Sequence, residues 1–237
     1  MTRPALILDL DGTVVDAVPD FAAAMNRLMV ELGLRSVTGP EIAGYLGDGP
    51  RKLVERVLAA RGLPMIEAAH DRFLADYTAH AAELTTAFPG VAETLDAFRA
   101  AGWAVLVCTK KPEAATRAML AGLGLLDRFD GIGAGDSFAV SKPDPRHLTM
   151  TLAAAGLDRA PAVMVGDHAN DVAAARGAGL PCIFAGWGHG PARMAAGADL
   201  VATRFAELVR MAPQALAARG VSAPMPQVRA GQPTTRS

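Results

Sequence analysis

The chain has 237 residues, of which 51% are hydrophobic, so it can bury a sizeable core and is too apolar to be disordered over most of its length. Its 23 lysines and arginines nearly balance 24 aspartates and glutamates, and the formal net charge of -1 argues against a basic surface that follows a nucleic acid backbone. Because no apolar run reaches the length of a membrane span or a signal-peptide core, we predict a cytoplasmic protein that binds neither nucleic acid nor membrane.

The predicted elements begin with a buried strand over residues 5–9, which runs into the carboxylates of Asp9 and Asp11. From residue 17 to residue 84 the patterns are helical and no convincing strand occurs, which predicts a helical insertion hinged near residues 16–20 and 82–88. Short β-like runs then alternate with helical segments, as is typical of a parallel sheet covered by helices on both faces. Further strands are expected at residues 103–108, 162–166, 181–185 and 199–202.

The predicted fold is therefore α/β, with a Rossmann-like parallel sheet as the core and an inserted helical domain. The core domain is expected to comprise residues 1–16 and 85–220, and the insertion residues 17–84. Residues 221–237 lose the apolar periodicity and gain proline, glutamine, threonine and serine, which predicts a disordered tail.

The two cysteines, Cys108 and Cys182, lie in apolar runs with no C-x-x-C spacing, which is typical of buried thiols. The five histidines form no H-x-x-x-H pair, so the sequence does not favour a zinc site.

Polar side chains follow the expected strands at the points where those strands end. Because the carboxyl ends of parallel strands meet at one edge of a sheet, these side chains are expected to share one cleft. They are Asp9, Asp11, Gly12 and Thr13 after the first strand, Thr109 after the second, Lys142 in "SKPDP", and Asp167 and Asp171 in "GDHAND".

These residue types fit phosphoryl transfer from a monoester through an aspartyl phosphate. Asp9 is the expected nucleophile, and Asp11 the acid that protonates the leaving oxygen and the base that then activates water. Thr109 and Lys142 are expected to hold the transferring oxygens, where negative charge spreads in the transition state.

A magnesium ion suits the same cleft, since Mg²⁺ prefers oxygen ligands and keeps several waters. Its expected ligands are Asp9, Asp167 and the backbone carbonyl of Asp11, and Asp171 is expected behind these ligands rather than on the ion. The cation and Lys142 would also offset the repulsion between the paired carboxylates.

At this point four stretches are informative together, namely "DLDGTVVD", "VCTKKP", "SKPDP" and "GDHAND". In order and spacing they resemble the four motifs of the haloacid dehalogenase superfamily, and the helical insertion resembles its C1-type cap. Within that superfamily, "GYLGDGPRKLVERVL" and "GLPCIFAGWGHG" look most like phosphoglycolate phosphatases. The resemblance implies a Mg²⁺-dependent phosphatase that hydrolyses a small phosphate ester, with 2-phosphoglycolate as the expected substrate.

Two residues depart from the family pattern. Lys110 replaces the asparagine of T-N-K-P, and it is expected to bind the substrate together with Gly12 and Thr13. If it acts through its backbone N–H to phosphate, the replacement changes little, whereas a role of the side chain would alter substrate choice or rate. His168 stands where serine is usual, and a neutral imidazole can still form a hydrogen bond there.

In the cap, the glycine loop at Gly47 and the guanidinium of Arg51 are expected to receive the carboxylate of 2-phosphoglycolate.

Other functions remain open at the level of sequence. Within the superfamily these are a sugar-phosphate phosphatase, a pyrophosphatase, a phosphomutase and a dehalogenase. A phospho-accepting signalling module also places Asp, Thr and Lys at strand ends around Mg²⁺, but Asp11 has no purpose in a switch that must keep its phosphate. The sequence is compatible with a monomer or a homodimer.

Overall fold

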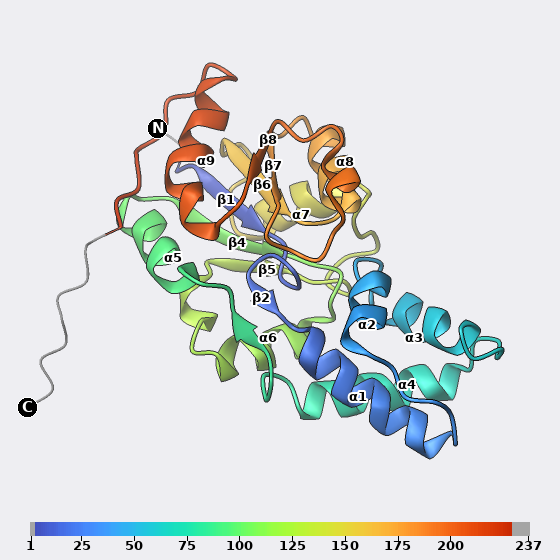
Figure 1. Ribbon diagram of the computed structural model, residues 1–237. Helices are drawn as coiled ribbons and strands as arrows, with labels where there is room; N and C mark the ends of the chain where they lie inside the picture. The colour runs from blue at the N-terminus through green and yellow to red at the C-terminus, as the bar shows by residue number, and fades with distance from the viewer. Residues whose placement is uncertain (1–2, 229–237) are drawn as a thin grey trace, which may run out of the picture.

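The computed structural model describes residues 3–228, and its centre is a six-stranded sheet in which all neighbouring strands are parallel (Figure 1). The strand order is β5-β4-β1-β6-β7-β8, so β1 lies between β4 and β6. The strands are β1 Ala5–Leu8, β4 Ala104–Cys108, β5 Gly131–Gly133, β6 Ala162–Gly166, β7 Cys182–Ala185 and β8 Leu200–Ala202. The predicted α/β fold with a parallel sheet is confirmed.

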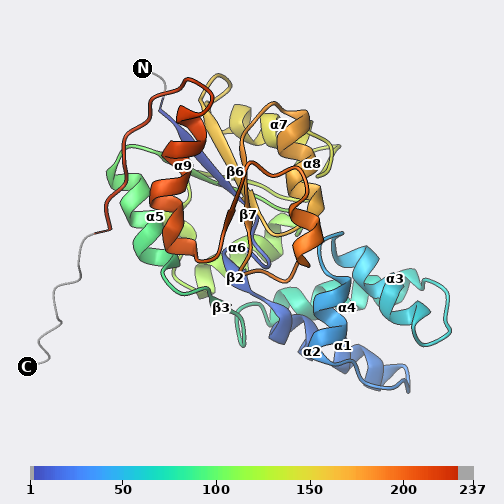
Figure 2. The ribbon, with the colours of Figure 1, turned by 45° about the horizontal axis from the view of Figure 1, so that its top comes forward.

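Helices cover both faces of this sheet, with α5, α6 and α9 on one face and α7 and α8 on the other (Figure 2). In β1, Leu6 and Leu8 pack under the first group, whereas Ala5 and Ile7 pack under the second. Successive side chains of a strand point to opposite faces, so a strand covered on both sides must be apolar throughout. The helices are α5 Val91–Ala100, α6 Glu113–Gly122, α7 Arg146–Ala154, α8 Ala169–Gly177 and α9 Leu208–Ala217, with 3-10 turns η1 Leu126–Arg128, η2 Ala192–Ala195 and η3 Phe205–Glu207.

The edge strand β5 lies in the run "GIGAGDSFAV", after which Lys142 was expected, but no bounds were predicted for this strand, because Gly-Ile-Gly has a low strand propensity. Close packing explains the glycines. A Cβ added at Gly133 would lie 1.9 Å from the hydroxyl of Thr151 on α7. The glycine-rich run therefore serves contact between α7 and the sheet edge.

Between β2 (Val15–Asp16) and β3 (Thr86–Ala87) the fully described chain contains four helices and no strand. We call these helices the helical insertion. In α1 the buried side chains of Phe21, Met25 and Leu28 recur at helical spacing, and in α4 those of Phe73 and Tyr77 do the same. The four helices are α1 Val18–Glu31, α2 Gly39–Tyr45, α3 Pro50–Ala59 and α4 Glu67–Ala79.

Two chain segments connect the helical insertion to the sheet, and they lie side by side. Val15 pairs with Ala87, and Asp16 with Thr86, in the antiparallel ribbon of β2 and β3. The buried carboxylate of Asp20 accepts hydrogen bonds from the backbone N–H groups of Leu84 and Thr85, both at 2.9 Å. These contacts hold the start and the end of the insertion together.

The segment after α9 differs from the predicted tail. Residues 221–228 have no regular structure, but Pro226 is buried, and Val221 and Ala223 pack against the core. The indole N–H of the buried Trp103 donates to the carbonyl of Pro224 at 2.8 Å. An indole buried in the core needs an acceptor, and this segment supplies it. The remaining predicted tail, 229–237, lies outside the described residues.

None of the helices among residues 3–228 is long and apolar enough to cross a membrane.

Candidate active site

Asp9 lies directly after β1, at the edge of the sheet where the strands end. Its backbone N–H continues the pairing with β6 by donating to Val165 at 2.9 Å. Its carboxylate accepts the N–H of Leu10 at 2.7 Å and lies 3.1 Å from the ammonium of Lys142. Asp9 is thus held in a fixed position with a cation beside it, and its side chain remains 13% exposed.

The ammonium of Lys142 connects Asp9 to a second carboxylate. Lys142 is buried, and its nitrogen lies 2.6 Å from the carboxylate of Asp171. Burial disfavours the charged lysine, but Asp171 and Asp9 outweigh this effect and raise the pKa of Lys142 above its ordinary value. The lysine that was predicted to hold phosphate oxygens is therefore fully charged and placed next to the nucleophile candidate.

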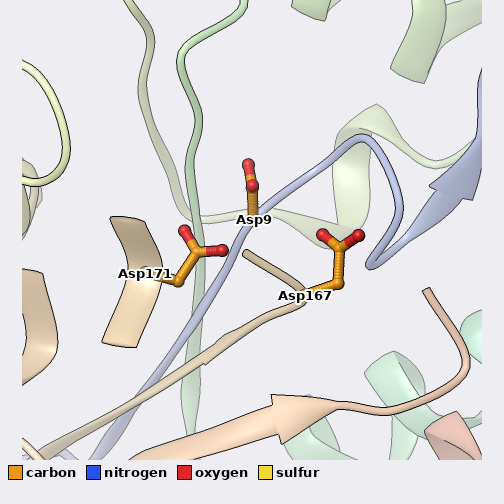
Figure 3. A group of neighbouring side chains, drawn as sticks. All are labelled: Asp9, Asp167 and Asp171. Atoms are coloured by element: carbon orange, nitrogen blue, oxygen red, sulfur yellow. The ribbon is translucent and has the colours of Figure 1, made fainter. Parts of the chain in front are cut away.

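The side chains of Asp9, Asp167 and Asp171 lie close together (Figure 3) and form an acidic cluster. One oxygen of each lies within 4.8 Å of the others. Burial raises the pKa of Asp167 to about 7, and the negative charges of Asp9 and Asp171 add to this increase.

The donor set of the acidic cluster fits a divalent metal ion. All three groups offer carboxylate oxygens, which hard cations prefer, and the crowded negative charge is what such a cation would offset. The side chains of the predicted ligands Asp9 and Asp167 lie in this cluster, together with Asp171, which was expected behind them. The third predicted ligand is the backbone carbonyl of Asp11, which is not a side-chain group.

The carboxylate of Asp11 turns instead to Lys111, whose nitrogen lies 2.9 and 3.2 Å from its two oxygens. The same ammonium contacts the hydroxyl of Tyr77 on α4. Burial raises the pKa of Asp11 and lowers the pKa of Lys111, and in each case the partner's charge acts in the opposite direction. Two oppositely charged groups are therefore paired at the boundary between core and helical insertion.

A cavity of about 40 Å³ lies at this boundary, and we call it the ester cavity. The stacked rings of Phe21 and Tyr77, with centroids 4.3 Å apart, form part of its wall. The ammonium of Lys111 lies 4.7 and 4.4 Å from these two ring centroids, within the range of a cation–π contact. The lining combines Asp9, Asp11, Thr109, Lys110, Lys111 and Pro112 of the core with Phe21, Leu46, Gly47, Gly49, Pro50, Leu53, Leu74 and Tyr77 of the insertion.

The loop 46–49 of the insertion contacts the core through Asp48. Its carboxylate accepts a hydrogen bond from Asn170 at 2.8 Å and lies 3.5 Å from the ammonium of Lys110. Partial burial disfavours the charge of Asp48, but hydrogen bonds from Asn170 and Arg56 outweigh it and lower its pKa to about 2. The lysine that departs from the family pattern thus meets a carboxylate of the insertion.

Glycine is required at two of the predicted site positions. Gly12 has φ +82°, and an added Cβ would lie 2.3 Å from the carboxylate of Asp167. Gly47 has φ +102°, and an added Cβ would lie 2.2 Å from the imidazole of His168. Both positions combine a left-handed backbone with close approach, which a side chain would prevent.

Three other residues from the sequence analysis, Thr13, His168 and Arg51, have contacts in the structure that the sequence did not predict. The buried hydroxyl of Thr13 donates to Asp167 at 3.3 Å, so it contacts the acidic cluster. His168 caps α8, and its Nδ1 accepts the N–H of Asn170 at 3.2 Å, as a serine hydroxyl can at an N-cap. Arg51 is not brought into the cleft: its side chain is 54% exposed and pairs with Glu67 on α4.

Thr109 and Lys110 do line the ester cavity, together with Asp9 and Asp11. Thr109 is buried, and its hydroxyl accepts the N–H of Lys111 at 3.2 Å.

Four residues of this site were not predicted, namely Lys111, Tyr77, Asp48 and Asn170. Lys111 stands inside the quoted motif "TKKP", so the motif itself was a usable signal. Tyr77, by contrast, reads as an ordinary apolar position of α4, and nothing local indicates that its hydroxyl meets a core lysine.

Comparison with known proteins gives a consistent result. Residues 6–185 match the family described as haloacid dehalogenase-like hydrolase. A phosphoglycolate phosphatase of Mesorhizobium japonicum is 38% identical over 193 residues, which are 80% of this chain and 85% of that protein.

Two solved structures have similar folds. A predicted phosphoglycolate phosphatase from Haemophilus somnus has a TM-score of 0.81 at 24% identity and covers 90% of this chain and 99% of its own. CbbY from Rhodobacter sphaeroides in complex with phosphate has a TM-score of 0.72 at 27% identity and covers 88% of this chain and 96% of its own.

Proposed function

The chain belongs to the haloacid dehalogenase-like hydrolases and is a phosphoric monoester hydrolase of the phosphoglycolate phosphatase type, and we propose that it hydrolyses 2-phosphoglycolate through a phosphoryl group carried on Asp9. The main support for this proposal is the position of Asp9, which is held at the end of β1 beside Lys142. Asp9 and Asp11 both line the ester cavity.

In the first step a carboxylate oxygen of Asp9 attacks phosphorus, and the bond from phosphorus to the ester oxygen breaks. Lys142 and Thr109 stabilise the negative charge that spreads over the transferring oxygens. Lys142 suits this task because Asp171 and Asp9 keep it charged while burial keeps water away from it.

Asp11 donates the proton that the leaving oxygen needs. In the second step Asp11, now ionised, takes a proton from the water that attacks the acyl phosphate, and Asp9 is released. Asp11 also distinguishes this activity from a phospho-accepting switch, because a base next to the acyl phosphate shortens its lifetime.

A divalent cation, Mg²⁺ in this proposal, would be held by the carboxylates of Asp9 and Asp167 and by the backbone carbonyl of Asp11, and when bound it would offset the negative charge of the phosphoryl group. Asp171 lies beside these groups and is bound by Lys142 and by the N–H of His168. The residues behind the acidic cluster support this arrangement. Thr13 and the backbone N–H groups of His189 and Gly190 donate to Asp167 and orient its carboxylate.

The helical insertion acts as the cap that covers the reacting groups. Its side chains close the ester cavity over Asp9 and Asp11, and its loop 46–49 is tied to α8 and to Lys110. By excluding bulk water, this cap protects the acyl phosphate from hydrolysis other than by the water that Asp11 activates.

The proposed function is tested by phosphate release from a panel of 2-phosphoglycolate, a sugar phosphate, pyrophosphate and a nucleotide, with Mg²⁺ and with EDTA. We expect turnover of 2-phosphoglycolate above the others, and only with Mg²⁺. The variant Asp9→Asn serves as the blank, because an amide cannot form the acyl phosphate. Preference for a sugar phosphate or pyrophosphate would refute the substrate, and full activity of Asp9→Asn would refute the nucleophile.

A further inference from the structure

The cation expected to read the substrate's carboxylate is absent from the ester cavity. Arg51 is exposed and paired with Glu67, whereas the ester cavity is lined by two lysines, Lys110 and Lys111. Lys110 already pairs with Asp48 of the insertion and is 20% exposed. Lys111 is only 2% exposed and meets no carboxylate other than that of Asp11 among the described residues.

We propose that Lys111 binds the carboxylate of the substrate, and that the substrates are phosphate monoesters with a carboxylate one carbon from the ester oxygen. This inference rests on the proposed function and specifies its substrate class. Tyr77 of α4 contributes its hydroxyl to the same subsite.

The position of Lys111 relative to Asp11 gives the first argument. The leaving oxygen of an ester must come within hydrogen-bond distance of Asp11 to receive a proton. In 2-phosphoglycolate the carboxylate lies one methylene group beyond that oxygen. The ammonium of Lys111, at 2.9 Å from Asp11, is therefore within reach of a carboxylate attached at this point.

The charge around Lys111 gives the second argument. A buried ammonium needs an anionic or strongly polar partner, and here the other neighbours are the aromatic rings of Phe21 and Tyr77. When the carboxyl group of Asp11 serves the leaving oxygen, Lys111 loses its anionic partner. A substrate carboxylate restores the pair, and a neutral group in its place does not.

The apolar wall of the ester cavity gives the third argument. The apolar side chains of Leu46, Leu53 and Leu74 complete the wall and strengthen electrostatic contacts by excluding water.

The inference is tested with two esters that differ only at the carboxylate, 2-phosphoglycolate and 2-hydroxyethyl phosphate. The measured quantity is the ratio of their kcat/KM values. We expect this ratio to fall about 100-fold in Lys111→Met, since a buried charge pair with the substrate is lost. Any effect on Asp11 alters both esters and cancels in the ratio.

The matched control is Lys52→Met, the same chemical change at a lysine of α3 that is 53% exposed and pairs with Glu55. It should leave the ratio within about 2-fold of the wild-type value, as surface substitutions do. A ratio equally unchanged in Lys111→Met would overturn the inference, while phosphate release from both esters would still support the phosphatase.

Calorimetric binding separates the two proposals further. In the Asp9→Asn background, Lys111→Met should weaken 2-phosphoglycolate about 100-fold and leave 2-hydroxyethyl phosphate nearly unchanged. Equal affinity of the Asp9→Asn protein for both esters would contradict the role of Lys111, and this comparison needs no folded Lys111 variant. If the wild-type chain hydrolyses neither ester, the proposed function fails, and the binding measurement still decides the inference.

Discussion

Gly12 is the residue at which the site depends most directly on the absence of a side chain. A Cβ there would overlap the carboxylate of Asp167, and the φ of +82° is itself unfavourable for alanine. We expect Gly12→Ala to abolish phosphatase activity and to lower the free energy of unfolding. Activity is measured by phosphate release and stability by urea unfolding.

Gly33 in the helical insertion provides the control, because its φ is +66° but no atom lies within 4 Å of an added Cβ. Gly33→Ala should cost about 1 kcal/mol of stability from the backbone alone and should leave activity intact. Equal losses in the two variants would mean that contact with Asp167 is not the cause.

Asp11 acts in both steps of the proposed reaction, and a good leaving group separates them. With p-nitrophenyl phosphate the first step needs no acid, so Asp11→Asn should still form the acyl phosphate on Asp9. Hydrolysis of that intermediate should slow by about 100-fold, since the base is missing. Mass spectrometry of the quenched protein should then find a phosphoryl group on Asp9. Turnover at the wild-type rate would contradict the role of Asp11.

At the scale of elements, loop 46–49 is the part of the helical insertion that is hydrogen-bonded to α8 of the core. Asn170 at the start of α8 donates to the carboxylate of Asp48 and to the carbonyl of Gly47, at 2.8 and 3.0 Å. We expect Asn170→Ala to raise KM for 2-phosphoglycolate about 10-fold, because a hydrogen bond to a charged group is lost where the insertion meets the core. Steady-state kinetics measure this change.

The control for Asn170→Ala is Asp71→Asn on α4, whose side chain is 80% exposed. That variant should keep the wild-type KM. Because the pKa of Asp48 is lowered to about 2, this carboxylate stays ionised above about pH 5. The hydrogen bond from Asn170 to Asp48 should therefore not change between pH 6 and 8. A KM effect of Asn170→Ala that disappeared between pH 6 and 8 would argue against the contact with Asp48.

At the scale of the whole molecule, His147 makes stability depend on pH. Its Nδ1 accepts the N–H of Lys142 at 3.1 Å, and its other nitrogen contacts the carbonyl of Ala134 at 3.0 Å. Burial lowers the pKa of His147 to about 4, and the positive charge of Lys142 contributes. The folded protein therefore keeps this imidazole neutral, whereas in the unfolded chain its pKa is about 6.5.

As the pH falls below about 6.5, the unfolded state binds this proton first, so the free energy of unfolding decreases until about pH 4. We expect His147→Asn, which retains an acceptor for Lys142, to lose less stability than the wild type between pH 7.5 and pH 5. Urea unfolding at both pH values measures the two decreases, and equal decreases would contradict the assignment. His80→Gln changes a 41% exposed imidazole of the insertion and serves as the control.

The sequence by itself determined the sheet and the set of residues at its edge. Apolar runs such as "ALIL" and "AVLVC" are too short for helices and indicate strands covered on both faces, and parallel strands bring their carboxyl ends together. For this reason Asp9, Lys142 and Asp167 could be assigned to one cleft from their places after predicted strands. Local patterns were sufficient because strand direction fixes where such residues lie.

The tertiary structure alone decided how the helical insertion meets that edge. Hydrophobic spacing predicts that α1 and α4 bury Phe21 and Tyr77, but it does not state which core group they cover. From sequence, Lys111 resembles a surface cation, but in the structure the aromatic rings and Asp11 surround it. Arg51 was predicted to bind the substrate, but in the structure it pairs with Glu67. Contacts between segments far apart in the chain depend on the relative position of two packed bodies, and no local periodicity encodes that position.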